Sequence, residues 1–382
     1  MKKKILFIID SLNSGGAERS LISLLSVLDY KRFSVELLLF SENGLFLPLI
    51  PSNVKIITIK EEKSSFSIKK LYKRIKISLM LRNPYIMRSY HSAQIIWSNL
   101  KEDLPTLQTN YDIAIAYSQG FPTYFAIKNV NAKRKICWVN TDYKMAAYNK
   151  SFDEEYYNMY ERIVTVSDAN KKIFENEFPQ FRKKTKLIYD INSPQLIESL
   201  SLSINEFPDN FTGTKILTIG RLVEAKGYDL ALEACQILKK QGVNFRWYAI
   251  GEGPLKCKLE RSIKQKGLKD YFVLLGTFSN PYPLLKQCDL YVQPSKYEGY
   301  GLAIAEARIL KKPIVTTDFS TAHNQIRHRE NGLIVKMTPE SVVEGINEIL
   351  SNSDLIRKIT SSHDVNNLGT ENEINKFYSI IH

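Results

Sequence analysis

The sequence predicts an α/β protein built from two doubly wound domains, each with a parallel sheet buried on both faces. Three observations support this. At 382 residues the chain is long enough for two domains, short apolar runs alternate with helical patterns, and a polar segment interrupts that alternation near the middle. Hydrophobic residues make up 44% and charged residues 24% of the chain, as in ordinary globular proteins rather than disordered or fibrous ones.

The expected strands are short apolar runs that lie about one helix length apart, as in βαβ units. In the first half they are KILFII, VELLLF, VKIITI, DIAIAY, KICWVN and RIVTVS, and in the second half KILTIG, RWYAIG, YFVLLG, DLYVQPS and KPIVTT. The first run breaks at Asp10 without a small-residue cleavage site, so we interpret it as a strand and not as a signal peptide. No run approaches the roughly 20 apolar residues that span a bilayer.

The segment 190–213 is rich in Ser, Asn, Pro and Asp, which is typical of a connector. We therefore predict an N-terminal domain over residues 1–195 and a C-terminal domain over residues 196–369. Residues 370–382 have a weak helical period, and we expect a closing helix there that packs back on the first domain.

A formal net charge of +13 favours anionic partners, such as phosphates, nucleic acid or an acidic membrane. No recognised nucleic-acid motif is present, so we expect no nucleic-acid partner. The four cysteines and five histidines show no metal-ligand spacing. The sequence therefore predicts no metal site, and reduced thiols in the cytoplasm.

A turn of two glycines, Gly15 and Gly16, follows the first expected strand and opens a helix. Free N–H groups at such a turn favour a phosphate or sugar oxygen. The alternative, that the turn only packs a strand against a helix, stays open. No complete dinucleotide fingerprint is present, which disfavours a nicotinamide-dependent dehydrogenase.

The most informative segment runs from Tyr297 to Ala307, a loop that leads into an apolar helix. Its second acidic residue, Glu306, lies among apolar neighbours, so we expect a buried carboxylate that needs donors, such as the hydroxyls of a ribose. An Arg or Lys partner is the alternative. Between Glu298 and Glu306, glycines expose the amides at a helix N-terminus, where a departing diphosphate would be stabilised.

Two cations, Arg221 and Lys226, follow the strand KILTIG at the carboxyl end where open α/β sheets bind ligands. We expect them to clamp the phosphates of a nucleotide through charge-assisted hydrogen bonds. The alternative is an exposed pair of cations in a Lys-rich protein.

Taken in order, these motifs resemble family 4 of the retaining glycosyltransferases, which have the two-domain GT-B fold. The matching segments span most of the chain and are GGAER, GRLVEAKG, GEGP at 251–254, LLGTFSNPYPLLKQCDLYVQPS and EGYGLAIAEA. The resemblance implies two Rossmann-like domains that face each other across a cleft, with the acceptor bound by the first domain and the nucleotide sugar by the second.

The resemblance also implies roles for individual residues. Arg221 and Lys226 would hold the donor diphosphate, Glu298 would contact hydroxyls of the donor sugar, and Glu306 would bind the nucleotide ribose. The remaining donor-binding positions would be the amides of Tyr300, Gly301 and Leu302 at the phosphates, Gly15 and Gly16 in the cleft, and Gly251 and Gly253 near the nucleotide.

One position departs from the family pattern. Many members carry a histidine after the fifth strand, where this chain has Asn140. An asparagine cannot titrate, but its amide can bind a hydroxyl of the donor sugar. Asp142 is an alternative polar participant, or it caps a turn.

We therefore expect a transfer that needs no cofactor and no metal, and that keeps the anomeric configuration of the donor. UDP is the favoured nucleotide and GDP the second. A GT-B epimerase and a non-catalytic partner subunit remain as alternatives.

The segment 66–80 predicts an amphipathic helix. Eight Lys or Arg residues and no acidic ones occur between Lys63 and Arg88. The apolar face would hold Ile68, Leu71, Tyr72, Ile75 and Leu79, and the basic face Lys69, Lys70, Lys73, Arg74 and Lys76. This layout is typical of a helix on an anionic membrane, although the stripe could instead pack on its own sheet. The membrane interpretation implies a glycan or lipid-linked acceptor, as in capsule or a related polysaccharide, at the inner face of the cell membrane.

Overall fold

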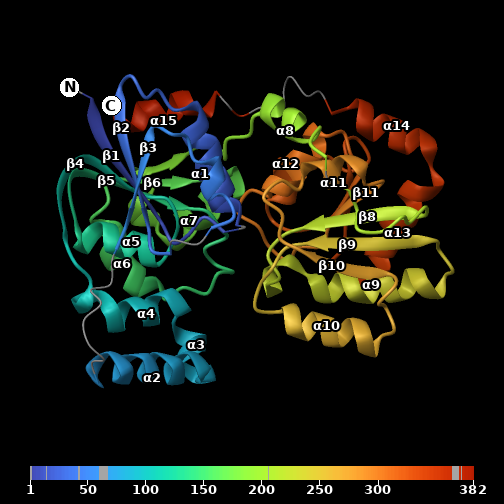
Figure 1. Cartoon of the computed structure of the whole chain (residues 1–382), viewed down its shortest axis with the longest axis horizontal. Coiled ribbons are helices and arrows are strands. Elements are labelled where there is room, and N and C mark those ends of the chain that lie inside the picture. The colour runs from blue at the N-terminus through green and yellow to red at the C-terminus, as the bar shows by residue number, and fades with distance from the viewer. Residues whose placement is uncertain are drawn as a thin grey trace. The chain divides into compact units, whose positions relative to one another are not determined.

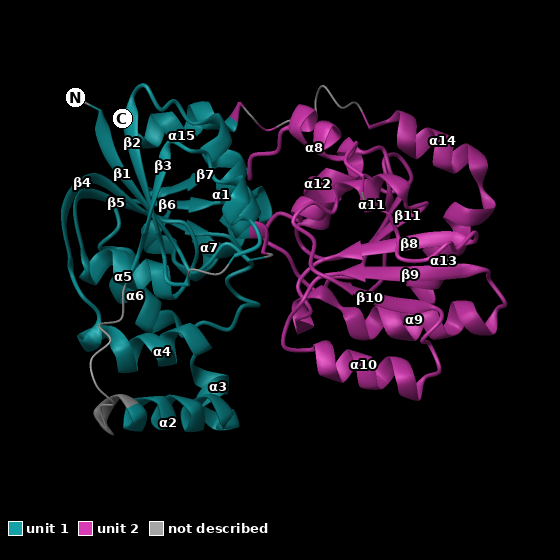
Figure 2. Cartoon of the chain, viewed as in Figure 1, with its two compact units in different colours: residues 1–13, 17–189, 373–382 teal, residues 14–16, 190–372 magenta. Residues whose placement is uncertain are grey.

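The computed structural model describes residues 2–13, 15–41, 44–59, 68–204, 206–363, 370 and 372–382. The chain divides into two compact units (Figure 2). The first contains residues 1–13, 17–189 and 373–382, and the second contains residues 14–16 and 190–372. The division at residue 190 lies near the boundary that the sequence predicts at 195.

The first unit is built on a seven-stranded sheet with the order β3-β2-β1-β4-β5-β6-β7, in which every pairing is parallel (Figure 1). Its strands are β1 (Lys3–Ile9), β2 (Phe33–Leu39), β3 (Val54–Thr58), β4 (Leu107–Ala116), β5 (Val130–Val139), β6 (Arg162–Thr165) and β7 (Thr185–Leu187). Its helices are α1 (Gly16–Val27), α2 (Ile68–Arg82), α3 (Pro84–Ser89), α4 (Ser92–Leu100), α5 (Phe121–Lys128), α6 (Lys150–Asn158), α7 (Asp168–Glu177) and α15 (Glu373–Ile381).

Both faces of this sheet are covered, because successive residues of a strand point to opposite sides. Leu6 and Ile8 of β1 pack into a cluster with aromatic residues of α4 to α7. Phe7, which lies between them, instead stacks on Phe377 of α15, with ring centroids 6.1 Å apart. The C-terminal helix therefore packs on the first unit.

The second unit has a six-stranded parallel sheet with the order β10-β9-β8-β11-β12-β13. Its strands are β8 (Thr214–Ile219), β9 (Phe245–Ile250), β10 (Phe272–Gly276), β11 (Leu290–Gln293), β12 (Ile314–Thr317) and β13 (Leu333–Val335). Its helices are α8 (Pro194–Leu200), α9 (Tyr228–Lys240), α10 (Lys256–Gln265), α11 (Tyr282–Gln287), α12 (Leu302–Ile309), α13 (Pro339–Ser351) and α14 (Ser353–Ser361).

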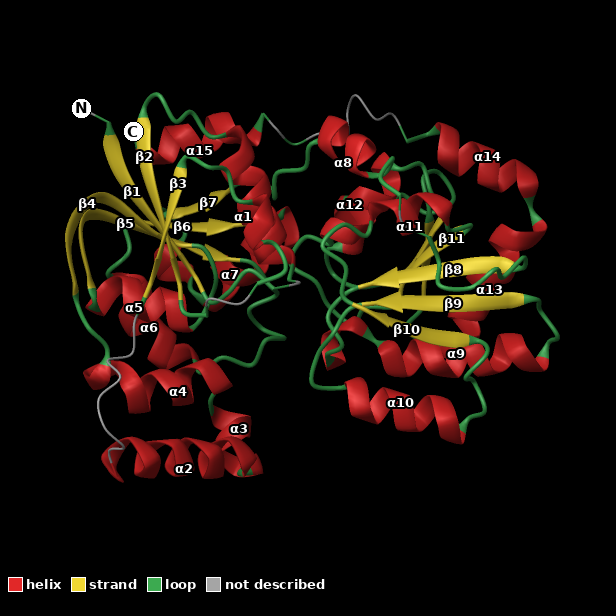
Figure 3. Cartoon of the chain, in the orientation of Figure 1, coloured by secondary structure: helices red, strands yellow, loops and turns green. Residues whose placement is uncertain are grey.

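Helices cover the second sheet on both faces (Figure 3), and a hydrophobic cluster lies on each face. One is formed with α9, α10, α13 and α14, and the other with α8, α11 and α12. The expected fold class, α/β with two parallel sheets each buried on both faces, is confirmed.

Each sheet reverses the order of its strands at one place. In the first unit the reversal lies between β1 and β4, and in the second between β8 and β11. Loops that leave the carboxyl ends of these strands diverge to opposite faces, and ligands of open α/β sheets bind there. This rule directs attention to the loops after β8 and β11, and after β1, β4 and β5.

The helix α2 does not bury its apolar stripe. Leu71 is 43%, Tyr72 67%, Ile75 51% and Leu79 64% exposed. The alternative that this stripe packs on the sheet of its own domain is therefore wrong for these four residues. Residues 66 and 67 of the expected helix lie outside the described part of the chain. Among the described residues, no helix has both the length and the apolar character to cross a membrane.

Candidate functional site

An ion pair stands at the strand reversal of the second unit. Lys226 belongs to the short turn after β8, and Glu298 belongs to the loop after β11. The Lys226 ammonium nitrogen lies 2.6 Å from Oε1 of Glu298, and the two side chains are 22% and 11% exposed. Two of the predicted site residues are therefore in direct contact, although 72 positions separate them in the sequence.

The carboxylate of Glu298 is held by further donors. Gln293, the last residue of β11, donates through Nε2 to Oε1 at 2.9 Å, and the Ser295 hydroxyl donates to the same oxygen at 2.7 Å. Oε1 therefore accepts three hydrogen bonds, whereas Oε2 accepts none from the described residues. This leaves one oxygen of an oriented carboxylate available for a hydroxyl of a ligand.

The N-terminus of α12 follows directly on this loop. Gly301 precedes the helix with a φ of 85°, a left-handed conformation that glycine adopts without strain, and none of the described side chains caps the helix. Gln325 donates to the carbonyl oxygens of Tyr300 and Gly301 at 2.5 and 3.2 Å. These bonds hold the turn so that the first amides of α12, beginning at Leu302, keep the orientation that favours an anion.

Glu306 is fully buried in α12. The hydroxyl of Tyr282, at the start of α11, donates to its Oε1 at 3.0 Å. One donor to this buried carboxylate is therefore a neutral phenol. A carboxylate has further acceptor capacity, which a ribose diol could use.

The loop that carries Arg221 is fixed by its neighbour. Leu222 N–H donates to the carbonyl oxygen of Glu252 at 2.9 Å, so the loops after β8 and β9 run side by side. A Cβ at Gly251 would lie 1.9 Å from the carbonyl oxygen of Gly220, and one at Gly253 would lie 2.5 Å from that of Leu222. Both glycines thus permit this close backbone approach, and their contact with a nucleotide stays a prediction.

The two expected phosphate-binding cations differ in their surroundings. The side chain of Arg221 is exposed and makes no hydrogen bond or ion pair with the described residues, whereas Lys226 is half-buried and paired. A free guanidinium beside an oriented ammonium is suited to a diphosphate, which can accept bidentate hydrogen bonds.

In the first unit, Asn140 immediately follows β5. Its Nδ2 and Oδ1 atoms are both buried, and neither has a hydrogen-bond partner in the described part of the chain. A buried amide without partners costs free energy, roughly 1–3 kcal/mol. Nε2 of Gln119 is also buried without a partner among the described residues, whereas Oε1 of this side chain accepts from Thr141 N–H at 3.2 Å. Unsatisfied polar atoms at the carboxyl ends of β4 and β5 indicate a place where a ligand supplies the partners.

The predicted glycine turn lies in the segment between β1 and α1. Gly16 is the first residue of α1, and the division of the chain groups residues 14–16 with the second unit. Asp142 accepts from Met145 N–H at 3.0 Å, so it caps a turn, as the alternative proposed.

Sequence reasoning did not identify the residues that position the predicted ones. These are Gln293, Ser295, Tyr282 and Gln325 in the second unit and Gln119 in the first. One signal was available for the first two, because the strand DLYVQPS ends in polar residues where a buried strand would otherwise stay apolar.

Comparison with known proteins defines the class. Residues 204–363 match the family model of glycosyl transferases group 1. The fold is GT-B, and these findings place the chain in the glycosyltransferase superfamily with that fold.

Particular relatives can be named. Over 93% of this chain and 92% of the relative, the sequence is 26% identical to N-acetylgalactosamine-N,N'-diacetylbacillosaminyl-diphospho-undecaprenol 4-alpha-N-acetylgalactosaminyltransferase of Campylobacter jejuni. It is 30% identical to an uncharacterized glycosyltransferase of Methanocaldococcus jannaschii, and spans about half of that relative's length (51%). HepE of Anabaena, solved with UDP and glucose, is similar in structure with a TM-score of 0.71, at 17% identity over 99% of each chain.

Proposed function

We propose that this chain is a retaining glycosyltransferase of family 4 that transfers a sugar from UDP-sugar to a hydroxyl of a glycan or lipid-linked intermediate of the cell envelope. The observation that carries the proposal is the pairing of Lys226 with Glu298 beside the uncapped N-terminus of α12. Both lie within the segment that matches the group 1 family. UDP in the HepE structure and the diphospho-undecaprenol-linked acceptor of the Campylobacter relative support the choice of substrates.

The residues suggest how the chemistry would proceed. The bond from the anomeric carbon to the phosphate oxygen breaks, and Lys226, Arg221 and the α12 amides meet the negative charge that develops on the diphosphate. The acceptor hydroxyl attacks from the same face, and its proton passes to the departing phosphate. Glu298 would orient the sugar through its free Oε2, and Asn140, which cannot take the proton, would bind a sugar hydroxyl.

This route supplies positive charge from the protein, so we propose a transfer that needs no metal. Addition of EDTA is expected to leave the rate unchanged. NMR of the product is expected to show the anomeric configuration of the donor, and an inverted product would exclude the retaining mechanism.

Nucleotide binding gives the most direct test. We expect UDP to raise the melting temperature of the wild type more than GDP or ADP does, without added metal. Glu306→Gln should weaken UDP binding in calorimetry by roughly 10- to 100-fold, because hydrogen bonds between a charged group and a hydroxyl contribute about 1.5–3 kcal/mol. The substitution keeps the side-chain volume, so the fold should survive.

Glu260→Gln, on the exposed side of α10, is the matched control and should bind UDP like the wild type. If no nucleoside diphosphate binds the wild type, the proposal fails and the non-catalytic partner subunit is favoured. If an isomerised UDP-sugar forms without an acceptor, the chain is an epimerase.

We further propose that α2 rests on the anionic inner face of the cell membrane, which would place the protein at the cytoplasmic surface. Its stripe of Leu71, Tyr72, Ile75 and Leu79 is exposed. Neither α2 nor α3 contains an acidic residue. Exposed apolar side chains among cations bind an anionic lipid surface through burial and charge together.

Sedimentation with vesicles tests this surface. The wild type should bind vesicles that contain phosphatidylglycerol, more weakly at high salt, and should not bind pure phosphatidylcholine. Leu79→Asp is expected to weaken binding roughly tenfold or more, from the lost burial of one leucine. Leu196→Asp, which changes a leucine of α8 that is 40% exposed, should have no effect. Equal binding by both variants would exclude α2 as the contact.

A further inference from the structure

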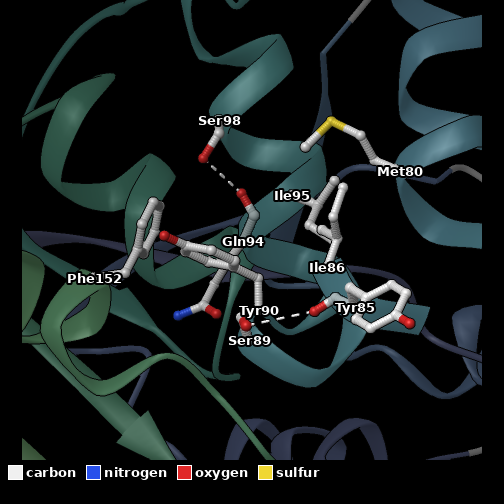
Figure 4. Close-up of a pocket in the computed structure, with 9 residues that line it drawn as sticks. All are labelled: Met80, Tyr85, Ile86, Ser89, Tyr90, Gln94, Ile95, Ser98 and Phe152. Carbon is white, nitrogen blue, oxygen red and sulfur yellow. Dashed lines mark hydrogen bonds between the residues drawn. The ribbon is translucent and has the colours of Figure 1, made fainter. Parts of the chain in front are cut away.

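A pocket of about 500 Å³ lies in the first unit beside α2 (Figure 4). It is lined by side chains from α2, α3, α4, the turn that joins the last two, and α6. Six of these nine residues are aliphatic or aromatic. The lining consists of Met80, Tyr85, Ile86, Ser89, Tyr90, Gln94, Ile95, Ser98 and Phe152.

The glutamine and serine side chains among these nine are engaged within the protein, whereas the hydroxyls of Tyr85 and Tyr90 make no hydrogen bond to the described residues. Gln94 donates to Asn149 O and Asp153, and its Oε1 accepts from His91 N–H and Asn149 N–H. The Ser98 hydroxyl donates to Gln94 O at 2.8 Å, and the Ser89 hydroxyl donates to Tyr85 O at 3.4 Å.

A sugar in this pocket would lose hydrogen bonds to water and find, among the nine lining residues, only the hydroxyls of Tyr85 and Tyr90 as unengaged side-chain partners. A hydrocarbon would lose none. The chemistry of the walls therefore favours a hydrocarbon chain.

The helices α2 and α3, which contribute residues to the pocket, carry positive charge next to these residues in the sequence. Arg82 follows Met80 by two positions, and Arg88 directly precedes Ser89. Both side chains are exposed and have no ion-pair partner among the described residues. Since α2 and α3 contain no acidic residue, a phosphate group on the occupant would meet these arginines without repulsion.

The pocket is also connected to the loop of Asn140 inside the same unit. Gln94 donates to Asp153 Oδ1 at 2.7 Å, and the Tyr143 hydroxyl donates to Asp153 Oδ2 at 2.8 Å. Burial raises the pKa of Asp153 to about 6. Tyr143 lies three residues after Asn140, so one buried network joins the pocket wall to the loop in which the unsatisfied amide stands.

We propose that this pocket holds the hydrocarbon chain of a phosphate-bearing lipid, and that this lipid is the anchor of the acceptor. The chain would enter among α2, α3 and α4, with its phosphate at Arg82 and Arg88. The identification of the lipid as an acceptor rests on the proposed transferase function, whereas the binding of its hydrocarbon chain in the pocket does not.

Calorimetry with hexyl, octyl and decyl phosphate, each at monomeric concentrations, tests the pocket. The three probes share one head group, so any other phosphate site would bind them equally. Affinity for the wild type is expected to rise roughly tenfold for each two-carbon extension, as more methylenes leave water. Ser98→Phe fills the pocket and should abolish this dependence on chain length.

Ser351→Phe is the matched control, because Ser351 of α13 also donates to the carbonyl oxygen four residues earlier, at 2.7 Å, and lies in the other unit. This variant should retain the dependence of affinity on alkyl chain length. Ser89→Phe fills the pocket from α3 and replaces Ser98→Phe if that variant does not fold.

The proposal is overturned if the wild type shows no dependence on chain length, or if a folded pocket-filling variant keeps it. It is also overturned if chain binding occurs only on phospholipid vesicles and is unchanged by Ser98→Phe, because the contact would then be with bulk lipid. UDP binding, measured on the same samples, reports separately on the transferase function. A pocket-filling variant that loses the dependence of affinity on alkyl chain length but still binds UDP therefore separates the lipid proposal from the transferase proposal.

Discussion

Lys226→Ala is expected to lower the turnover of sugar transfer by roughly 100- to 1,000-fold, the range typical for loss of one group that stabilises charge in a transition state. The reason is the position of Lys226, whose ammonium group stands 2.6 Å from Glu298 and close to the N-terminus of α12. The free energy of unfolding should fall by no more than about 1–2 kcal/mol, because Glu298 keeps Gln293 and Ser295 as donors.

Lys296→Ala provides the control for this prediction. Lys296 is also ion-paired, with Asp229 at 2.7 Å, and it lies in the same loop two residues before Glu298. It is 39% exposed, and an exposed pair contributes little. The turnover of the Lys296→Ala variant should stay within a factor of about three of that of the wild type. Equal losses in both variants would show that general positive charge, and not the placement of Lys226, supports transfer.

Asn140→Leu is expected to separate activity from stability. Both amide atoms of Asn140 are buried without partners among the described residues, so a leucine of similar volume removes an unsatisfied polar group. The free energy of unfolding should rise by about 1 kcal/mol. The rate of transfer should nevertheless fall by roughly 10- to 100-fold, because the amide no longer binds the donor sugar. Chemical denaturation and a steady-state assay measure the two effects.

The neighbouring Asn170 supplies a control with the opposite sign. Its Nδ2 donates to Thr141 O at 2.6 Å, and it is also buried. Asn170→Leu should therefore destabilise the protein by about 1–3 kcal/mol, since a buried carbonyl oxygen loses its donor. If Asn140→Leu destabilises the protein to the same extent, Asn140 has a structural partner and the proposed contact with substrate is wrong.

Much of the fold could be predicted from the sequence. Each apolar run expected to form a strand does so, because a strand buried on both faces must be apolar along most of its length. The strands β7 and β13 were not expected, since three residues each are too short to stand out from their surroundings. The positions of Lys226, Glu298 and Asn140 after strands also followed from the sequence alone.

The tertiary structure decided what these residues contact. It placed Glu298 between Lys226 and Gln293, gave Glu306 a tyrosine donor, and left the Asn140 amide without a partner in the part of the chain that the structure describes. It also decided that the apolar stripe of α2 faces outward. Strand order and helix packing bring together residues that lie far apart in the chain, and neither is encoded in the local pattern that reveals a strand or a helix. The sequence by itself therefore determined the elements and the residues at their ends, and only the packing of those elements determined the partners.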